Sequence, residues 1–128
     1  MKLSRPTVIA FNEFKRIVYG DPNIKITSGY VLGAAYNLIK EEIDDIDWNK
    51  VNKKENQIVD NSLDKSITNI HTTLNIESSV LEGINKLQER LLSDPQAKRI
   101  HKSFVVKLVM FAALLKSIDD LPKIEIDD

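Results

Sequence analysis

The sequence predicts an all-α fold, a compact bundle of about five helices around a central apolar helix near the C-terminus. The most apolar run is Phe104–Leu115, in which Lys107 is the only charged residue. A helix that is apolar on all sides needs neighbours on all sides. Four other segments carry apolar residues at steps of three and four, the spacing of a helix that buries one face. With 128 residues the chain has the size of one domain, so we expect a single helical domain over residues 1–128.

The first helix is expected from Thr7 to Tyr19. Gly20 follows at the position where a left-handed residue commonly ends a helix. The predicted inner face consists of apolar residues at helical spacing: Val8, Phe11, Phe14, Ile17 and Val18.

Two short segments alternate apolar and polar residues as a strand does. They are Ile24–Ile26, after the first helix, and Lys123–Ile126, near the C-terminus. They could pair as a minor two-stranded ribbon, or they could be extended loops whose isoleucines fill the core, because strands this short are marginal.

The second helix is expected to start at Thr27 or Ser28 and to run to about Asp47. Small residues in its first turns, including Gly29 and Gly33, would let another helix come close. Its predicted inner face comprises Val31, Leu32, Ala35, Leu38, Ile39, Ile43 and Ile46.

Two further stripes follow a polar segment, Asn49–Gln57, that is expected to begin as a loop. They predict helices over about 55–74 and 77–93, or one long helix whose heptads across residues 59–91 could form a homodimer seam. We favour a break near Asn75, because β-branched and short polar residues surround it and asparagine is a good N-cap. The stripes are Val59, Leu63, Ile67, Ile70 and Leu74, then Val80, Leu81, Ile84, Leu87 and Leu91.

The central helix is expected from Pro95 to Leu121. Asp94 and Pro95 form a typical helix start, and Pro122 would stop the helix. Its apolar run of about twelve residues is short of the roughly 20 that cross a bilayer.

Composition excludes several classes of function. The chain has no cysteine, so it has no disulfide, thiolate zinc site or cysteine nucleophile. Its 18 basic and 19 acidic residues give a net charge of -1, which provides no overall attraction to nucleic acid or an anionic membrane. The start lacks the apolar region of a signal peptide. We therefore expect a cytoplasmic protein without a membrane association.

The densest polar cluster combines acidic residues with the only tryptophan. Negative charge at a helix C-terminus opposes the helix dipole, so a basic partner or nearby lysines should compensate it. Trp48 could anchor an interface or close the end of the core. The cluster is the predicted partner-binding surface, with Glu41, Glu42, Asp44, Asp45, Asp47 and Trp48 as its candidate residues.

No metal or cofactor site is expected. Asp45–Asn49 matches the first ligand positions of an EF-hand loop, but Lys50 and Asn56 stand where that loop needs glycine and glutamate. His71 is expected at the edge of a helix stripe, and His101 is expected to be a core histidine near Phe104.

The best basic patch is Lys98–Lys102, predicted in the first turns of the central helix, where the dipole also attracts anions. Lys98, Arg99 and Lys102 are therefore the candidate contacts of an alternative function, a helical nucleic-acid-binding regulator. No aromatic residues are interleaved to stack bases.

No catalytic constellation is recognisable in the sequence, so we expect a non-enzymatic protein that binds another protein. An inhibitor or immunity-type protein, or a helical subunit of a larger complex, would have this profile. Its partner could present a basic surface to the acidic cluster.

Overall fold

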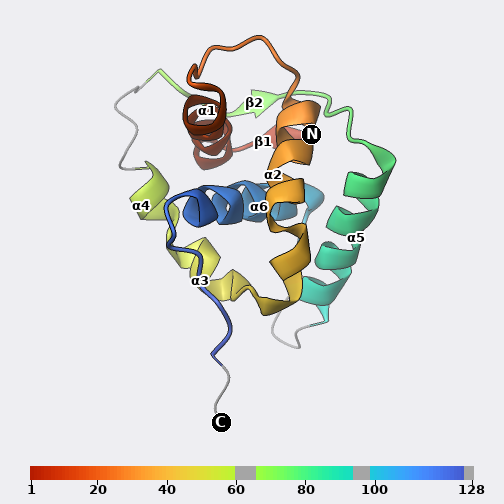
Figure 1. Ribbon diagram of the computed structural model, residues 1–128. Helices are drawn as coiled ribbons and strands as arrows, with labels where there is room; N and C mark the ends of the chain where they lie inside the picture. Colours follow the sequence, from red (N-terminus) through yellow and green to blue (C-terminus); the bar gives the residue numbers. More distant parts are fainter. Residues whose placement is uncertain (60–65, 94–98, 126–128) are drawn as a thin grey trace.

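The computed structural model describes residues 1–59, 66–93 and 99–125, and it confirms an all-α fold with a small two-stranded ribbon (Figure 1). Four long helices make most of the structure, and short elements join them. In chain order the elements are β1 (Lys2–Leu3), α1 (Arg5–Tyr19), α2 (Ser28–Ile39), the 3-10 helix η1 (Lys40–Asp45), α3 (Trp48–Lys53), α4 (Glu55–Val59), β2 (Ile70–His71), α5 (Ser78–Leu92) and α6 (Lys102–Ser117).

Helix α6 lies at the centre of the fold, as predicted, and α1, α2, α3 and α5 all pack against it (Figure 1). Ten of its residues are buried: Val105, Val106, Leu108, Val109, Met110, Phe111, Ala112, Ala113, Leu114 and Leu115. Lys107 is only half-buried, with its Nζ 4.8 Å from the ring centre of Phe104 and 5.7 Å from that of Phe111. The one charge in the apolar run therefore reaches the edge of the core, where it can remain hydrated.

The predicted ends of this helix are wrong. Residues 99 and 100 are not helical, and His101 is the extended N-cap residue; Asp94 to Lys98 lie outside the described residues. Gln88 donates from Nε2 to the Ile100 carbonyl at 2.8 Å, and this hydrogen bond holds the residues just before α6 against α5. The helix ends at Ser117 because Asp119 adopts a left-handed conformation, φ 57°, that breaks the helical path.

Helix α1 ends where the sequence predicts, at Tyr19. Gly20 is left-handed, φ 77°, and its N–H donates to the Arg16 carbonyl at 3.0 Å. The predicted stripe is wrong at its C-terminal end, since Ile17 and Val18 are 40% and 48% exposed. The buried face lies further toward the N-terminus and consists of Thr7, Ile9, Ala10, Phe11 and Phe14.

Helix α2 ends earlier than predicted, at Ile39, and the acidic segment continues as η1. Lys116 from α6 donates to the Leu38 carbonyl at 2.8 Å and so satisfies one of the free carbonyls at this helix end. The tighter 3-10 turn avoids extending an α-helix into a run of negative charge at its C-terminus.

The segment between α2 and α5 differs most from the prediction. Two short helices, α3 and α4, occupy most of the predicted loop at 49–57, and the predicted helix over 55–74 is absent from residue 67 onward. Residues 60–65, with Leu63, lie outside the described residues. Since the chain from 67 to 77 is not helical, one continuous helix over 59–91 and its homodimer seam are wrong. Helix α5 begins at Ser78 with Glu77, not Asn75, as its N-cap residue.

The ribbon forms between other residues than predicted. β1 and β2 are antiparallel, with Lys2 opposite His71 and Leu3 opposite Ile70. His71 is therefore an exposed strand residue, not a helical one. Ile24–Ile26 forms no strand, and Lys123 instead makes an isolated bridge with Ile46. The β-branched residues Ile70 and Thr72 find backbone partners at Leu3 and Met1, which helical spacing alone does not reveal.

Within the described residues, no helix combines the length and the apolar character needed to cross a membrane.

Candidate functional site

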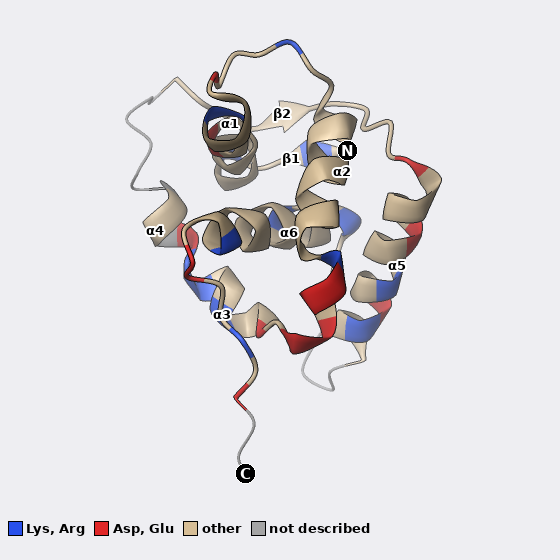
Figure 2. Cartoon of the chain, viewed as in Figure 1, with Lys and Arg blue, Asp and Glu red and all other residues tan. Residues whose placement is uncertain are grey.

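The acidic turn, residues 41–45, lies where α2 passes into η1 (Figure 2). Its Glu42 carboxylate is 2.5 Å from Lys116 Nζ and accepts a hydrogen bond from Lys123 Nζ at 2.6 Å. These hydrogen bonds, with that of Lys116 the largest cause, lower the pKa of Glu42 from 4.5 to about 2. Glu42 thus joins the end of α2 to α6 and to the C-terminal residues.

Asp44 is also engaged within the chain. Arg90 at the end of α5 donates from Nη1 to the Asp44 carboxylate at 2.7 Å and from Nη2 to the Asp44 carbonyl at 3.3 Å. Glu41 and Asp45 are exposed, and among the described residues neither carboxylate has an ion pair or hydrogen bond. About half of the negative charge in the acidic turn is therefore already neutralised by Arg90 of α5, Lys116 of α6 and Lys123 near the C-terminus.

Asp47 and Trp48 have structural roles at the start of α3. The Asp47 side chain is the N-cap and accepts from the Lys50 N–H at 3.1 Å. Trp48 is only 6% exposed, and its Nε1 donates to the Ile43 carbonyl at 3.3 Å. Of the two roles considered for Trp48, the structure shows the one in the core.

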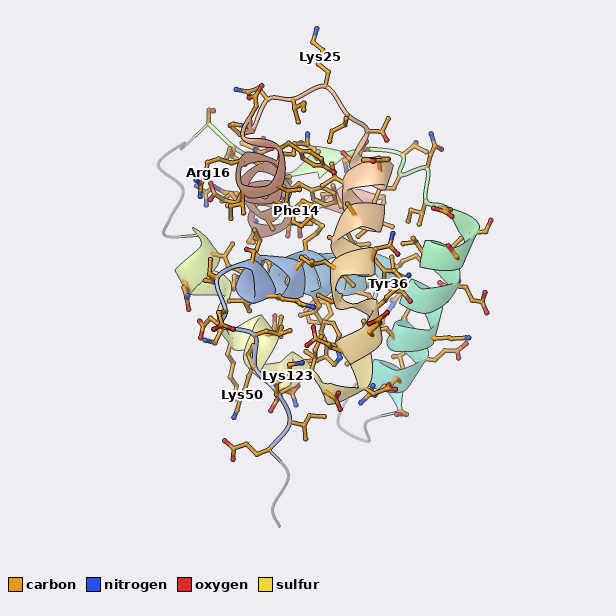
Figure 3. The ribbon with its side chains drawn as sticks, in the orientation of Figure 1. Phe14, Arg16, Lys25, Tyr36, Lys50 and Lys123 are labelled. Carbon is orange, nitrogen blue, oxygen red and sulfur yellow. The ribbon has the colours of Figure 1, made fainter. Side chains whose placement is uncertain are left out.

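Residues 122–125 form a C-terminal strap across these elements. The Asp47 N–H donates to the Pro122 carbonyl at 3.0 Å, and the Ile124 N–H donates to the Asp45 carbonyl at 2.8 Å. Lys50 lies 3.8 Å from Glu125, and Figure 3 shows Lys50 and Lys123 at this end of the molecule. The strap is held mainly by backbone hydrogen bonds and surface charges, since Ile124 is exposed.

An open groove of about 870 Å³, called the Trp48 groove below, lies where α3, the end of α5 and the start of α6 meet. Its apolar lining combines aliphatic and aromatic side chains from all three helices and the strap. These residues are Ile46, Trp48, Leu91, Ile100, Phe104, Leu108 and Ile124.

The charged part of the Trp48 groove lining is mainly basic. Besides two asparagines, the polar lining contains Lys53, Arg90 and Arg99, against one carboxylate, Asp47, which is occupied as a helix cap. Arg90 is paired with Asp44, but Lys53 and Arg99 are exposed and have no ion pair with a described residue. The groove therefore joins an apolar floor to the exposed cations of Lys53 and Arg99.

The structure divides the predicted basic patch. Lys98 lies outside the described residues, Arg99 lines the Trp48 groove, and Lys102 lines a different groove between α2 and α5. His101 is exposed at the N-cap position of α6, so the expected core position of this histidine is wrong. Arg99 and Lys102 consequently do not form one cationic surface on a helix.

The second groove, called the Tyr30 groove below, has a volume of about 960 Å³. One wall is α2, where Gly29, Gly33 and Ala34 leave a low surface and Tyr30 is 63% exposed. The other wall comes from residues 74–77 and the start of α5.

Among residues 1–59, 66–93 and 99–125, no three histidine or acidic side chains are placed to hold a metal ion.

Several residues that shape these sites were not identified from the sequence. Arg90, Lys116 and Lys123 neutralise the acidic turn from distant parts of the chain, and Lys53 faces the Trp48 groove from what was predicted to be a loop. The excess of acidic residues at a helix end indicated that compensating cations must exist. Their identity depends on tertiary contacts that span 46 to 81 residues.

Comparisons with protein-family models, curated proteins and solved structures found no match for this chain.

Proposed function

We propose that this chain is a non-enzymatic protein-binding module, such as an inhibitor or a helical subunit of a complex, that binds its partner in the Trp48 groove. The observation that carries the proposal is the combination of an apolar lining with the exposed cations of Lys53 and Arg99, which have no ion pair among the residues that the structure describes. Apolar anchors in a pocket supply most of the binding energy of an interface, and charges at the rim direct encounter.

The chemistry of the groove favours an acidic, amphipathic segment as the bound part of the partner. Its apolar side chains would cover Phe104 and Ile100, which are half-buried, while its carboxylates would meet Lys53 and Arg99. The acidic turn remains a candidate contact for a basic partner, but only Glu41 and Asp45 keep carboxylates without an intramolecular partner among the described residues. The groove thus has the stronger support.

The alternative of nucleic-acid binding has less support from the geometry. The two described cations of the predicted patch, Arg99 and Lys102, line separate grooves, and the floor beside Arg99 is largely aliphatic. Bases are held by exposed aromatic platforms along a basic groove, whereas Trp48 is almost fully buried.

The experiment uses Trp48 as a reporter, because it is the only tryptophan and lines the groove. A displayed library of random twelve-residue peptides is panned against the full chain, and selected peptides are titrated by tryptophan fluorescence. We expect the selected peptides to be rich in acidic and large apolar residues. Lys53→Glu and Arg99→Glu should each weaken binding about tenfold, as expected when one charge contact becomes repulsive.

Lys86→Glu is the matched control, since Lys86 is an exposed lysine of α5 outside the Trp48 groove. It should bind the same peptides with unchanged affinity. An equal loss of affinity in all three variants, or a preference for basic peptides, would refute binding of the partner in the Trp48 groove. Salt-sensitive gel shifts of DNA or RNA at micromolar protein would favour the alternative instead.

A further inference from the structure

The ribbon continues one residue beyond the pair of Lys2 and His71, and the segment that follows has no paired strand beside it among the described residues. Met1 and Thr72 exchange both backbone hydrogen bonds, with N···O distances of 2.8 and 3.0 Å. From residue 73 to residue 76, no backbone N–H or carbonyl forms a hydrogen bond with any described residue. The next bond is that of the Glu77 carbonyl, which accepts from Leu81 in the first turn of α5.

This segment nevertheless has the side-chain pattern of a strand. Thr72, Leu74 and Ile76 are half-buried, and the residues between them are exposed. Alternation with period two is typical of an extended chain with one face on the core. Residues 72–77 therefore resemble a strand of which only the first residue is paired.

The parity of an extended chain identifies which backbone groups are free. Since alternate residues of an extended chain present their N–H and carbonyl groups to the same edge, those of Leu74 and Ile76 belong to the edge of Thr72, which pairs with Met1. Asn75 presents its groups to the other edge, where its carbonyl packs closely against Gly29 of α2; a Cβ on Gly29 would lie 2.1 Å from the Asn75 carbonyl oxygen. One edge is thus closed by α2, and along the other edge residues 74 and 76 have no backbone partner among the described residues.

The open edge adjoins the Tyr30 groove. Met1, Leu74 and Ile76 all line this groove, so a strand that continued the ladder past Met1 would enter it. The low surface of Gly33 and Ala34 leaves room for a peptide backbone, and the exposed ring of Tyr30 could cover its side chains. An unpaired edge of this kind is a template for another strand.

We propose that Leu74 and Ile76 form a β-augmentation edge that binds an extended segment of a partner protein in the Tyr30 groove. The occupant is defined by main-chain chemistry: alternate residues of the segment exchange hydrogen bonds with Leu74 and Ile76, and the side chains between them contact Tyr30 and the floor of α2. This mode of recognition takes its affinity from backbone pairing. The edge is separate from the Trp48 groove and does not depend on the function proposed for it.

The test uses the full chain with its purification tag at the C-terminus, so that no added residue precedes Met1. Random decapeptides are selected on this protein, and each binder is remade in two forms, with N-methyl groups on its odd or on its even backbone amides. We expect one form to lose about tenfold or more in affinity and the other to bind nearly as well as the parent, because only alternate amides face a given edge.

Amide hydrogen exchange gives a second readout. Added peptide should protect the N–H groups of Leu74 and Ile76 and leave those of Thr73 and Asn75 unchanged. Tyr30→Ala should weaken the peptide about tenfold, as loss of an aromatic anchor does. Val18→Ala, which removes another exposed apolar side chain outside this groove, should have no effect.

Three outcomes would overturn the proposal: no peptide that protects Leu74 and Ile76, equal effects of both methylated forms, or protection of these amides by self-association alone. The last outcome would show a dimer in sedimentation and would identify a second copy of the chain as the occupant.

Discussion

Two glycines of α2 lie one turn apart, yet a side chain would meet very different surroundings at each. At Gly29 an added Cβ would lie 2.1 Å from the backbone oxygen of Asn75, far inside any real contact. At Gly33 the nearest atom is Val80 Cγ2 at 3.8 Å, an ordinary contact. Small residues at these positions were predicted to admit a neighbour, and the structure shows that only Gly29 is in close backbone contact.

Alanine at these positions should therefore have opposite effects. Gly29→Ala should destabilise the protein by about 1–3 kcal/mol, because the backbone at Asn75 must move. Gly33→Ala should be neutral or stabilise by about 0.5–1 kcal/mol through better helix propensity. Urea unfolding followed by circular dichroism measures both. Similar stabilities for the two variants would contradict the contact between α2 and residue 75.

Glu42 makes the stability of the protein depend on acid pH. Its pKa falls from 4.5 to about 2 on folding because of Lys116 and Lys123. A carboxyl group whose pKa is lower in the folded than in the unfolded state stabilises the folded state at any pH above its pKa in the unfolded state. This stabilisation is lost as the pH falls through the pKa of the group in the folded state. The stabilisation should thus be full above about pH 5 and should disappear toward pH 2.

Glu42→Gln should lower the midpoint of urea unfolding at pH 7, and the difference from wild type should shrink steadily between pH 4.5 and pH 2. Glu41→Gln is the control, since Glu41 is exposed and has no ion pair with a described residue. It should unfold like wild type at every pH. A constant difference between Glu42→Gln and wild type over this range would argue against the paired carboxylate.

At the scale of the elements, the sequence allowed the long helices to be predicted where burial follows one local pattern. The apolar run identified α6, and Gly20 marked the end of α1. The pattern failed where a contact far along the chain decides the structure. Ile70 lies on a helical stripe in the sequence but pairs with Leu3 in the ribbon. The entry into α6 likewise depends on Gln88 holding the Ile100 carbonyl.

In the candidate site, too, local features were predicted and contacts between distant residues were not. The acidic residues and Trp48 were correctly placed in one neighbourhood by sequence proximity, but proximity could not show that Trp48 is buried. Nor could it show that Arg90 neutralises Asp44, since these residues are 46 positions apart. Local sequence therefore predicts which charges exist, whereas the fold determines which of them remain free for a partner.

The short helix α3 depends on its cap. It has six residues, and the Asp47 side chain accepts from the Lys50 N–H in its first turn. Asp47→Ala should destabilise the protein by about 0.5–2 kcal/mol, whereas Asp47→Ser should retain most of the stability. Asp45→Ala is the matched control, because the exposed Asp45 side chain caps no helix. Thermal unfolding compares the three, and equal losses for serine and alanine at residue 47 would contradict the capping role.

At the scale of the whole molecule, one buried cluster joins both ends of the fold. Trp48 and Val51 of α3 belong to the same core as Phe14 of α1 and Phe111 of α6. Figure 3 shows Phe14 in the region between α1 and α2, whereas α3 lies on the other side of α6 (Figure 1). Because α6 contacts both groups, the two sides should lose their packing together.

Unfolding should accordingly be a single cooperative transition. Trp48 fluorescence reports only on the end of the molecule formed by η1, α3 and the strap, whereas far-ultraviolet circular dichroism reports on all helices. Small single domains unfold with coincident transitions when no part has a separate core, so both signals should give the same urea midpoint and the same slope. An earlier fluorescence transition would mean that α3 and the strap separate first, in which case the wall of the Trp48 groove would be a mobile element independent of the core around α6.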